Sequence, residues 1–284
     1  MREIVIEAPA KINLGLNISG VDGTGYHELD TVMAAVPLCD TVYVRLRGDS
    51  EIRTVFEWED AKQKAAIDPV HNSAYAAAKY VRDKFGVCGA DIRVVKRVPA
   101  AAGLGGSSCD AAAVLRALAE LHGIEVTIGD AAKLGSDTAF LFSAAAAARC
   151  TGRGEKLEII EGAKPLNMVI AASGFVNTGA CYRKFDELHP DGISTPCDTE
   201  GLIRGLQAGD LRIIAASIGN ALEAPARALE PEVGRTIDLL RTGDPAAVFM
   251  TGSGAAAVGL YKDAAAASIA AAALKGKRDF VFCG

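Results

Sequence analysis

VVKRVPAAAGLGGSSCDAAAVLRALAEL, residues 94–121, is the stretch around which the predicted fold is organised. Val94 and Val95 continue a β-branched run that favours a strand. Pro99 stops that strand. Three glycines follow, and because they have no side chains they predict a loop whose backbone is accessible: Gly103, Gly105 and Gly106. The first half of the stretch therefore predicts a strand that ends in a glycine loop.

The second half of the stretch predicts a helix. Apolar residues from Ala111 to Leu121 recur at helical spacing. Ser107 and Ser108 stand before them, and either could be the N-cap. Asp110, three residues after Ser107, completes a pair that is typical of a helix start. We therefore expect the helix to begin at the end of the glycine loop.

A strand, a glycine loop and a helix start suit an anion, most often a phosphate, because free N–H groups and the positive end of the helix dipole meet there. The chain has no Gly-Lys-Ser/Thr run, which excludes a Walker A loop. Ser108 stands where a G-x-G-x-x-G dinucleotide fingerprint needs its third glycine. The alternative is a tight turn whose small residues serve only packing.

PAAAGLGGSSCDAAA resembles the phosphate-binding motif of the GHMP kinases, the superfamily of galactokinase and of homoserine, mevalonate and phosphomevalonate kinases. Their loop wraps the ATP phosphates without a Walker lysine. Ala101, Ser107 and Cys109 replace Gly, Gly and Ser of the usual pattern. The resemblance implies Mg²⁺ beside the Ser108 hydroxyl. It also implies ATP contacts from Pro99, Ala100, Ala101, Ala102, Gly103, Leu104, Gly105, Gly106, Ser107, Ser108 and Cys109.

Composition bounds the class of protein. The 284 residues are 50% hydrophobic, enough for one large domain or two small ones. A net charge of −5 suggests no nucleic-acid or membrane partner. Seven cysteines without a C-x-x-C pair favour reduced thiols and make a zinc site a poor match. The start of the chain lacks a signal-peptide pattern, and the longest apolar run, residues 138–148, is too short to span a bilayer. We expect a cytoplasmic protein.

The N-terminal residues EIVIEAPAKINLGLNIS, 3–19, alternate with a period of two and predict two strands broken near Pro9. Lys11 lies opposite the apolar face and shares its side with Asn13. An exposed edge-strand lysine is the ordinary reading of Lys11. APAKINLGLNI, however, resembles the first GHMP motif, which implies that Lys11 lies beside the transferred phosphate and that Asn13 contacts the substrate.

GYHEL, residues 25–29, follows a glycine-rich turn. Tyr26 and His27 could be a loop aromatic and a half-buried histidine. The stretch also resembles the signature of a GHMP member that acts on a cytidyl-bearing substrate, in which the tyrosine stacks on the cytosine and the histidine bonds its edge. Stacking plus one directed hydrogen bond is what a pyrimidine needs.

Two further segments complete the first half. Alternation over residues 41–58 predicts a hairpin. Residues 71–87 predict a helix with Asn72 as a plausible N-cap, and the resemblance places Asn72 and Lys96 near the adenine.

LGSDTAF resembles a family segment whose aspartate faces the lysine of the first motif, so Asp137 is the leading catalytic candidate beside Lys11. Without the resemblance, Asp137 would be read as a turn or N-cap residue. Thr138 and Ala139 replace the family's Val-Pro pair, and alanines 144–148 stand where the family shows Gly-Gly.

In the second half, VNTGACY resembles the family's V-S-T-x-x-x-Y and makes Thr178 and Tyr182 candidates for the substrate site. Gly252 and Ser253 lie between two strand-like runs. They predict either a plain hairpin turn or the third GHMP motif, a glycine loop that approaches the substrate and braces the phosphate loop.

The resemblance implies an α+β, two-domain GHMP kinase fold. Residues 1–160 would form an ATP-binding domain like ribosomal protein S5 domain 2, and residues 161–284 a ferredoxin-like α/β sandwich, with the active site in the cleft between them. Lys11 and Asp137 would converge beside the triphosphate there.

The expected reaction is ATP-dependent phosphorylation, with Mg²⁺, of a hydroxyl on a small cytidyl substrate in non-mevalonate isoprenoid biosynthesis. We expect a monomer or homodimer with no nucleic-acid or membrane partner. The alternatives are another GHMP small-molecule kinase, acting on homoserine, mevalonate or a sugar, a nucleotide-binding protein without catalysis, and a dinucleotide-binding oxidoreductase with a parallel sheet.

Overall fold

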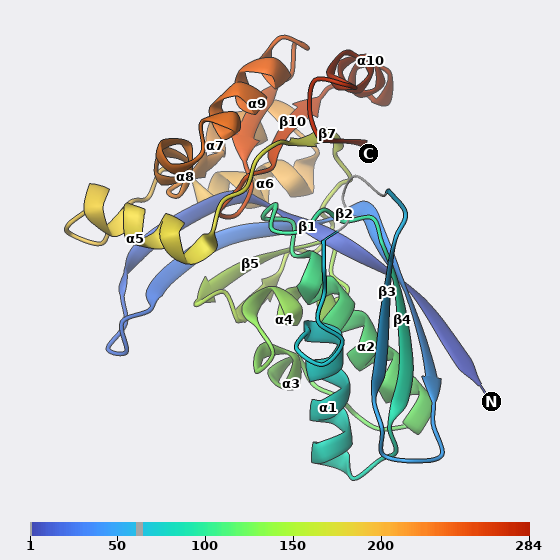
Figure 1. Ribbon diagram of the computed structural model, residues 1–284. Helices are drawn as coiled ribbons and strands as arrows, with labels where there is room; N and C mark the ends of the chain where they lie inside the picture. The colour runs from blue at the N-terminus through green and yellow to red at the C-terminus, as the bar shows by residue number, and fades with distance from the viewer. Residues whose placement is uncertain (1, 61–64) are drawn as a thin grey trace. The chain divides into compact units, whose positions relative to one another are not determined.

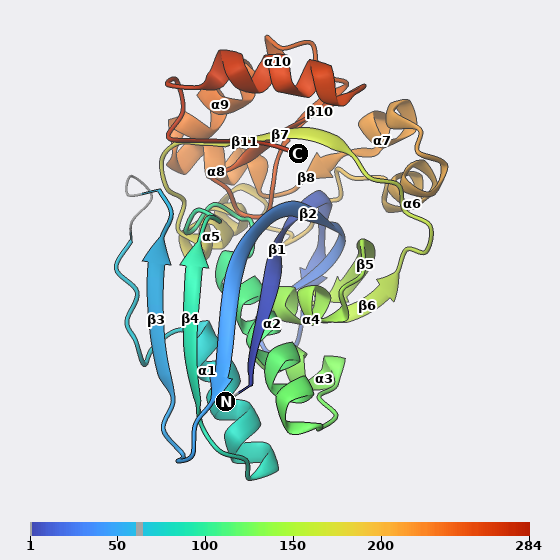
Figure 2. The same cartoon turned by 90° about the vertical axis from the view of Figure 1, so that its right-hand side faces the viewer.

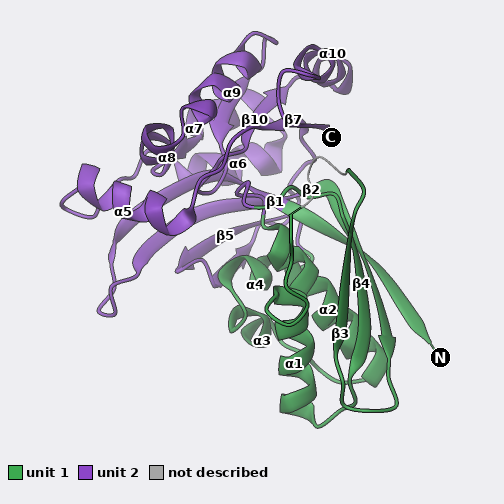
Figure 3. Cartoon of the chain, in the orientation of Figure 1, with its two compact units in different colours: residues 1–10, 36–100, 105–144 green, residues 11–35, 101–104, 145–284 purple. Residues whose placement is uncertain are grey.

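The computed structural model describes residues 2–60 and 65–284, which form two compact units (Figure 3). The first unit comprises Met1–Ala10, Val36–Ala100 and Gly105–Ala144. The second comprises Lys11–Ala35, Ala101–Leu104 and Ala145–Gly284. The two units are defined by how compactly their residues pack. They do not test the functional domain boundary expected at residue 160, which stays a prediction.

Two long strands, β1 (Glu3–Val21) and β2 (His27–Leu46), each contribute one part to each unit. The predicted break near Pro9 is wrong, because β1 continues through it for 19 residues. A proline lacks a donor, but its fixed φ is compatible with extended backbone, so a strand need not end there.

In the first unit, β4 (Ala90–Lys96) pairs antiparallel with β2 and parallel with β3 (Arg53–Trp58). β3 and β4 run side by side in Figure 1. The hairpin expected over residues 41–58 is therefore wrong, because β4 lies between its two arms. Alternation identifies strands but does not say which strands pair.

The helices of the first unit are α1 (Ser73–Phe85), α2 (Gly106–His122), α3 (Ile128–Ala132) and α4 (Ser136–Ser143). α2 packs against α1 and α4. Asn72 caps α1 by accepting a hydrogen bond from Tyr75 N at 2.8 Å, as predicted. The serine cap of α2 is wrong: its N-cap is Gly105, in the left-handed conformation, and Asp110 is buried instead of capping.

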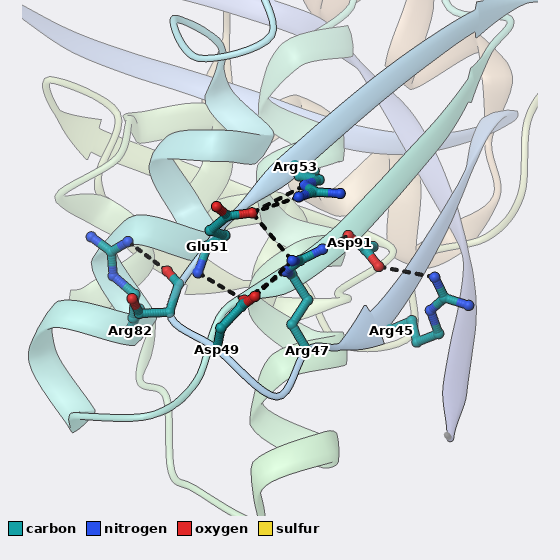
Figure 4. A network of polar contacts seen from close by, with 8 residues as sticks. Arg45, Arg47, Asp49, Glu51, Arg53, Arg82 and Asp91 are labelled. Atoms are coloured by element: carbon teal, nitrogen blue, oxygen red, sulfur yellow. Dashed lines mark hydrogen bonds and ion pairs between the residues drawn. The ribbon is translucent and has the colours of Figure 1, made fainter.

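A network of ion pairs ties the ends of these strands together (Figure 4). The Arg47 guanidinium donates to Asp49 and Asp91 at 2.7 and 2.8 Å, and to Glu51 at 3.2 Å. It thereby joins the end of β2 to the following turn and to β4, which fixes the turn that leads into β3.

The second unit contains a four-stranded antiparallel sheet in the order β11-β7-β10-β9. Its strands are β7 (Asn167–Ala172), β9 (Ala247–Met250), β10 (Ala257–Tyr261) and β11 (Phe280–Cys283). α9 (Pro231–Arg241) and α10 (Ala264–Leu274) pack along one face of this sheet (Figure 2). If β7, β9, β10 and β11 are numbered 1 to 4 along the chain, the order in the sheet is 4-1-3-2. This order in a β-α-β-β-α-β chain is the ferredoxin-like arrangement, so that prediction is confirmed.

The second unit also contains the parts of β1 and β2 that lie within Lys11–Ala35, together with several further elements. They are β5 (Ala147–Gly152), β6 (Lys156–Ile159), α5 (Thr178–Leu188), α6 (Thr199–Ala208), α7 (Leu211–Ser217), β8 (Gly219–Asn220) and α8 (Glu223–Leu229). β5 pairs with β2 and β6, and β8 pairs parallel with β1. Leu16 and Ile18 of β1 pack into one core with Val169 and Phe185. Among the described residues, no helix is both long and apolar enough to cross a membrane.

Candidate active site

The glycine loop leads into the N-terminus of α2 in the first unit. Among the residues that the structure describes, no side chain caps the first turn of α2, whereas α1, α3 and α5 are capped by Asn72, Thr127 and Asn177. The first N–H groups of a helix have no partner within the helix, and the dipole makes that end positive. The start of α2 is therefore suited to an anionic ligand, as the sequence predicts.

Beneath this helix start lies a buried ion cluster that sequence reasoning missed. Lys96 is 4% exposed, and its Nζ donates to the Asp40 carboxylate, to Asp110 Oδ2 at 2.7 Å and to Gly106 O at 3.1 Å. Asp40 also accepts from Arg97 N and Val98 N, at 2.5 and 2.9 Å. Lys96 thus holds the carbonyl of the first α2 residue and joins it to β4.

The charges of the cluster act on one another. Burial lowers the pKa of Lys96, but the Asp110 and Asp40 carboxylates outweigh burial and raise it, so the ammonium stays protonated. Burial raises the pKa of Asp110 to about 7, with Lys96 opposing and Asp40 adding to that shift. Asp40, Cys109 and Asp110 offer ligand atoms within 4.8 Å of one another, but the ammonium of Lys96 already serves as their cation.

Two other predicted residues of the first unit lie at helix starts. Asn72 caps α1, and its Nδ2 donates to Thr54 Oγ1 at 3.1 Å. Asp137 lies half-buried in the first turn of α4, after the N-cap Gly135. Ser107 is exposed and Ser108 half-buried in the first turn of α2.

In the second unit, Lys11 is the first of the predicted site residues. It is 4% exposed, which excludes the exposed edge-strand reading. Its Nζ donates to Asn13 Oδ1 at 2.6 Å, and Asn13 Nδ2 donates to Thr31 Oγ1 at 2.8 Å. The same-face prediction for Lys11 and Asn13 is confirmed, and the amide holds the ammonium in one place. Lys11 and Asp137 belong to different units, and their convergence stays a prediction.

The loop at 251–256 joins β9 and β10, so the hairpin reading is confirmed. It also braces the start of the phosphate loop: Ala256 N donates to Ala102 O at 3.2 Å. A Cβ added to Gly103 would lie 2.3 Å from Thr251 O, and one added to Gly252 would lie 3.0 Å from Gly103 O. Close backbone approach therefore requires glycine at both positions.

The predicted substrate residues form two groups in this unit. Thr178 Oγ1 lies 2.9 Å from Ser253 Oγ. His27 and Tyr182 have ring centroids 4.8 Å apart, and His27 Nε2 lies 2.7 Å from Asp186 Oδ1. Asp186 was not predicted, although it follows Tyr182 by one helical turn and so shares its face.

Tyr26 is 59% exposed, and among the residues that the structure describes the ring contacts of His27 are with Tyr182 and Phe185. The guanidinium of Arg153 lies over its ring at 4.0 Å, and Arg153 is itself held by Asp22 at 2.7 Å. One face of Tyr26 is therefore backed by a cation, a favourable arrangement for an aromatic ring. Neither Arg153 nor Asp22 was predicted, because their meeting depends on β5 pairing with β2.

Comparison with known proteins identifies the class. The family model for the GHMP kinases N terminal domain matches residues 72–153, and that for the GHMP kinases C terminal matches residues 202–278. A homoserine kinase from Cytophaga hutchinsonii shares the fold, with a TM-score of 0.71 at 18% identity over 100% of this chain and 95% of that one. The observed architecture and these matches together identify the two-domain fold of the GHMP kinases.

Particular relatives narrow the class further. The 4-diphosphocytidyl-2-C-methyl-D-erythritol kinase of Cutibacterium acnes is 35% identical over 95% of this chain and 90% of its own length. That of Bacillus subtilis is 33% identical over 91% and 88%. A crystal structure of a 4-(cytidine 5'-diphospho)-2C-methyl-D-erythritol kinase has a TM-score of 0.81 at 32% identity, over 99% of this chain and 98% of that one. The chain belongs to this family within the GHMP kinases, and so is an ATP-dependent kinase of small molecules.

Proposed function

We propose that the chain transfers the γ-phosphoryl group of ATP to the 2-hydroxyl of 4-diphosphocytidyl-2-C-methyl-D-erythritol. The names of the relatives, which match at 33–35% identity over about nine-tenths of the chain, support this substrate. The structural observation that supports this substrate best is the group formed by His27, Tyr182 and Asp186. A histidine oriented among aromatic rings is suited to bind a pyrimidine base.

Phosphoryl transfer depends on positioning and charge stabilisation rather than on covalent help from the protein. We assign Asp137 as the general base that takes the proton of the acceptor hydroxyl. Lys11 stabilises the charge that develops on the transferred group, and its hydrogen bond to Asn13 supports that role by keeping the ammonium oriented. The uncapped start of α2 receives the phosphates of ATP.

The loop residues 99–109 contact ATP in this proposal, with Asn72 and Lys96 nearer the adenine. Lys96 would act through the carbonyl of Gly106, because two carboxylates already bind its ammonium. Tyr26, Thr178, Gly252 and Ser253 position the substrate.

Mg²⁺ fits this site through oxygen donors. The half-buried Ser108 hydroxyl lies in the uncapped first turn of α2 and is the kind of hard ligand that Mg²⁺ prefers beside phosphate oxygens. When bound with ATP, the ion supplies charge neutralisation on the phosphates. The Asp40–Cys109–Asp110 group does not fit the ion, because Lys96 fills it.

A coupled assay with ATP and 4-diphosphocytidyl-2-C-methyl-D-erythritol tests the reaction directly. Homoserine, mevalonate and galactose serve as comparison substrates for the other GHMP activities. Turnover of one of these in preference to the cytidyl compound would replace our proposal. The oxidoreductase alternative predicts a parallel sheet, whereas the β2–β4 and β7–β10 ladders are antiparallel.

Asp137→Asn tests the general base. We expect the Michaelis constant for ATP to stay within about twofold and turnover to fall by roughly 10²-fold or more, a typical loss for general-base catalysis. Asp83→Asn, on the exposed face of α1, is the matched control and should keep wild-type rates. Retained turnover in Asp137→Asn would remove Asp137 from the mechanism.

His27→Ala tests the base site. We expect the Michaelis constant for the cytidyl substrate to rise by roughly tenfold or more, since an oriented hydrogen bond and a ring contact are lost. The Michaelis constant for ATP is the internal control and should not change. An equal rise for both substrates would contradict a cytosine site at His27.

A further inference from the structure

The imidazole of His27 has one nitrogen committed to a carboxylate. Nε2 lies 2.7 Å from Asp186 Oδ1, in the last turn of α5. The histidine side chain is 13% exposed and that of Asp186 is 50% exposed. The contact therefore lies at the rim of the His27 group, with the carboxylate on its solvent side.

The ring is also held against reorientation. The ring of Tyr182 is tilted by 30° at 4.8 Å, and the ring of Phe185 meets it edge-on at 5.6 Å. Phe185 is fully buried in the core of the second unit. A flip of the imidazole would exchange Nε2 for a carbon at Asp186 and lose the hydrogen bond. The packing therefore holds the plane of the ring, and the carboxylate selects which way round the ring lies.

A carboxylate can only accept a hydrogen bond, so its partner nitrogen must carry the proton. In neutral His27 this leaves Nδ1 as a lone-pair acceptor. Among the described residues, no hydrogen bond to Nδ1 is seen. A base edge that meets Nδ1 must then donate. Cytosine presents a 4-amino donor where uracil presents a 4-carbonyl acceptor.

We propose that Asp186 is a positioning residue that fixes His27 in the Nε2-protonated tautomer and so makes the site select a cytidyl over a uridyl substrate. This rests on the proposed function, in which His27 contacts the base. Asp186 itself acts through the imidazole. Its loss changes which base is accepted more than how fast the phosphoryl group is transferred.

The kinetic test compares 4-diphosphocytidyl-2-C-methyl-D-erythritol with its uridyl analogue at a pH where histidine is neutral. In Asp186→Asn the side-chain amide can either accept from Nε2 or donate to it, so both tautomers become accessible. We expect the cytidyl-to-uridyl ratio of kcat/KM to fall by about tenfold, the equivalent of one hydrogen bond of about 1.4 kcal/mol. The KM for ATP should not change.

Two variants separate this role from a structural one. Glu187→Gln removes the neighbouring acid, which pairs only with Lys184 among the described residues, and should keep the wild-type ratio. Asp186→Glu keeps a carboxylate one methylene further out and should recover part of the selectivity. A general loosening of α5 would lower kcat/KM for both substrates equally and would overturn the proposal.

The ¹⁵N resonances of the His27 ring give a readout that does not depend on turnover. The free wild-type protein should show a protonated Nε2 and an unprotonated Nδ1, and Asp186→Asn should show both nitrogens averaged between tautomers. An unchanged pattern in the variant would refute the role of Asp186, even if the cytidyl reaction is confirmed. A wild-type protein that does not turn over the cytidyl compound, but shows the expected ring pattern, would instead refute the proposed function.

Discussion

Lys96 shows how one ammonium can serve two carboxylates in a site almost without water. Lys96, Asp40 and Asp110 are each at most 4% exposed. Two negative charges around one positive charge leave a net negative charge beneath the helix start. A buried charge of this kind is costly, and the molecule lowers the cost by holding a proton on Asp110 to a higher pH than usual.

This predicts a pH dependence of stability. In the folded chain the pKa of Asp110 rises from 3.8 to about 7, so the folded state binds a proton that the unfolded chain has released. Its contribution to the free energy of unfolding is therefore full below about pH 4 and is lost as the pH rises to about 7. Asp110→Asn cannot titrate, and its stability relative to wild type should rise across this window by about 1–4 kcal/mol.

Denaturant unfolding of both proteins at pH 4, 5.5 and 7 measures this difference. Carboxylates outside the Lys96 cluster titrate in both proteins and cancel. A stability difference that stays constant with pH would show that folding does not raise the pKa of Asp110.

Ala144 is the first residue of the alanine run that departs from the family pattern. It ends α4 with φ of 58°, a left-handed conformation that favours glycine, and it is exposed. Ala101, where the usual loop pattern has glycine, has φ of 51°. Both alanines stand where the backbone itself calls for glycine.

Ala144→Gly should therefore stabilise the chain. Relief of the left-handed conformation is worth about 1–2 kcal/mol, and the greater freedom of glycine in the unfolded chain removes about 0.4–1 kcal/mol of it. We expect a net gain of about 0.5–1 kcal/mol by thermal or denaturant unfolding. Ala146→Gly, two residues on and without a positive φ, should lose stability; equal effects at the two positions would argue against strain at Ala144.

At the scale of elements, the loop between β9 and β10 and the start of the phosphate loop form one backbone-to-backbone contact. Gly103 has φ of 77° and faces Thr251 O, and Asn13 N donates to Thr251 Oγ1 at 2.8 Å. β1, the loop after β4 and the β9–β10 hairpin thus meet at Thr251. Position along the chain, residues 13, 103 and 251, gives no hint of this meeting.

Gly103→Ala should separate these elements. Its Cβ would lie 2.3 Å from Thr251 O, so the backbone must shift as well as accept a strained φ. We expect a loss of about 2–4 kcal/mol in stability and a higher KM for ATP with a smaller effect on the KM of the second substrate. Gly48→Ala, which meets nothing within 4 Å, is the matched control. Wild-type stability and KM in Gly103→Ala would contradict the bracing.

At the scale of the whole molecule, the chain returns to its N-terminal strands to complete its second core. Leu16 and Ile18 of β1 are at most 3% exposed in the core built on β7, β10, α9 and α10. Gly15 and Leu16 also pair with β8. Residues 161–284 alone therefore do not complete the hydrophobic core of the ferredoxin-like sheet.

A fragment of residues 161–284 should accordingly fail to fold into a stable domain. It lacks two buried side chains of the core, each worth about 2–5 kcal/mol when truncated to alanine. We expect helical circular dichroism without a cooperative thermal transition. A cooperative transition, with dispersed amide resonances, would support an autonomous boundary at residue 160.

Local chemistry determined part of this molecule. The glycine loop and the apolar spacing of α2, the Asn72 cap and the shared face of Lys11 and Asn13 follow from residues close in sequence, so the sequence alone predicts them. The ferredoxin-like arrangement and the membership in the GHMP kinases were also predicted, through a resemblance carried by several motifs in their order along the chain. The loop, the helix spacing, the cap and the shared strand face depend on periods and caps that act within a few residues, whereas the resemblance depends on motifs along the whole chain.

Only the tertiary structure decided the rest. β4 lies between β2 and β3, Asp110 pairs with Lys96 instead of capping α2, and Asp186 meets His27 across 159 residues. An alternating pattern leaves the partner of a strand open, and a carboxylate near a helix start can cap or be buried. Which of these occurs is set by long-range packing, because the free energy of burying and pairing these groups exceeds the local preference of any one residue.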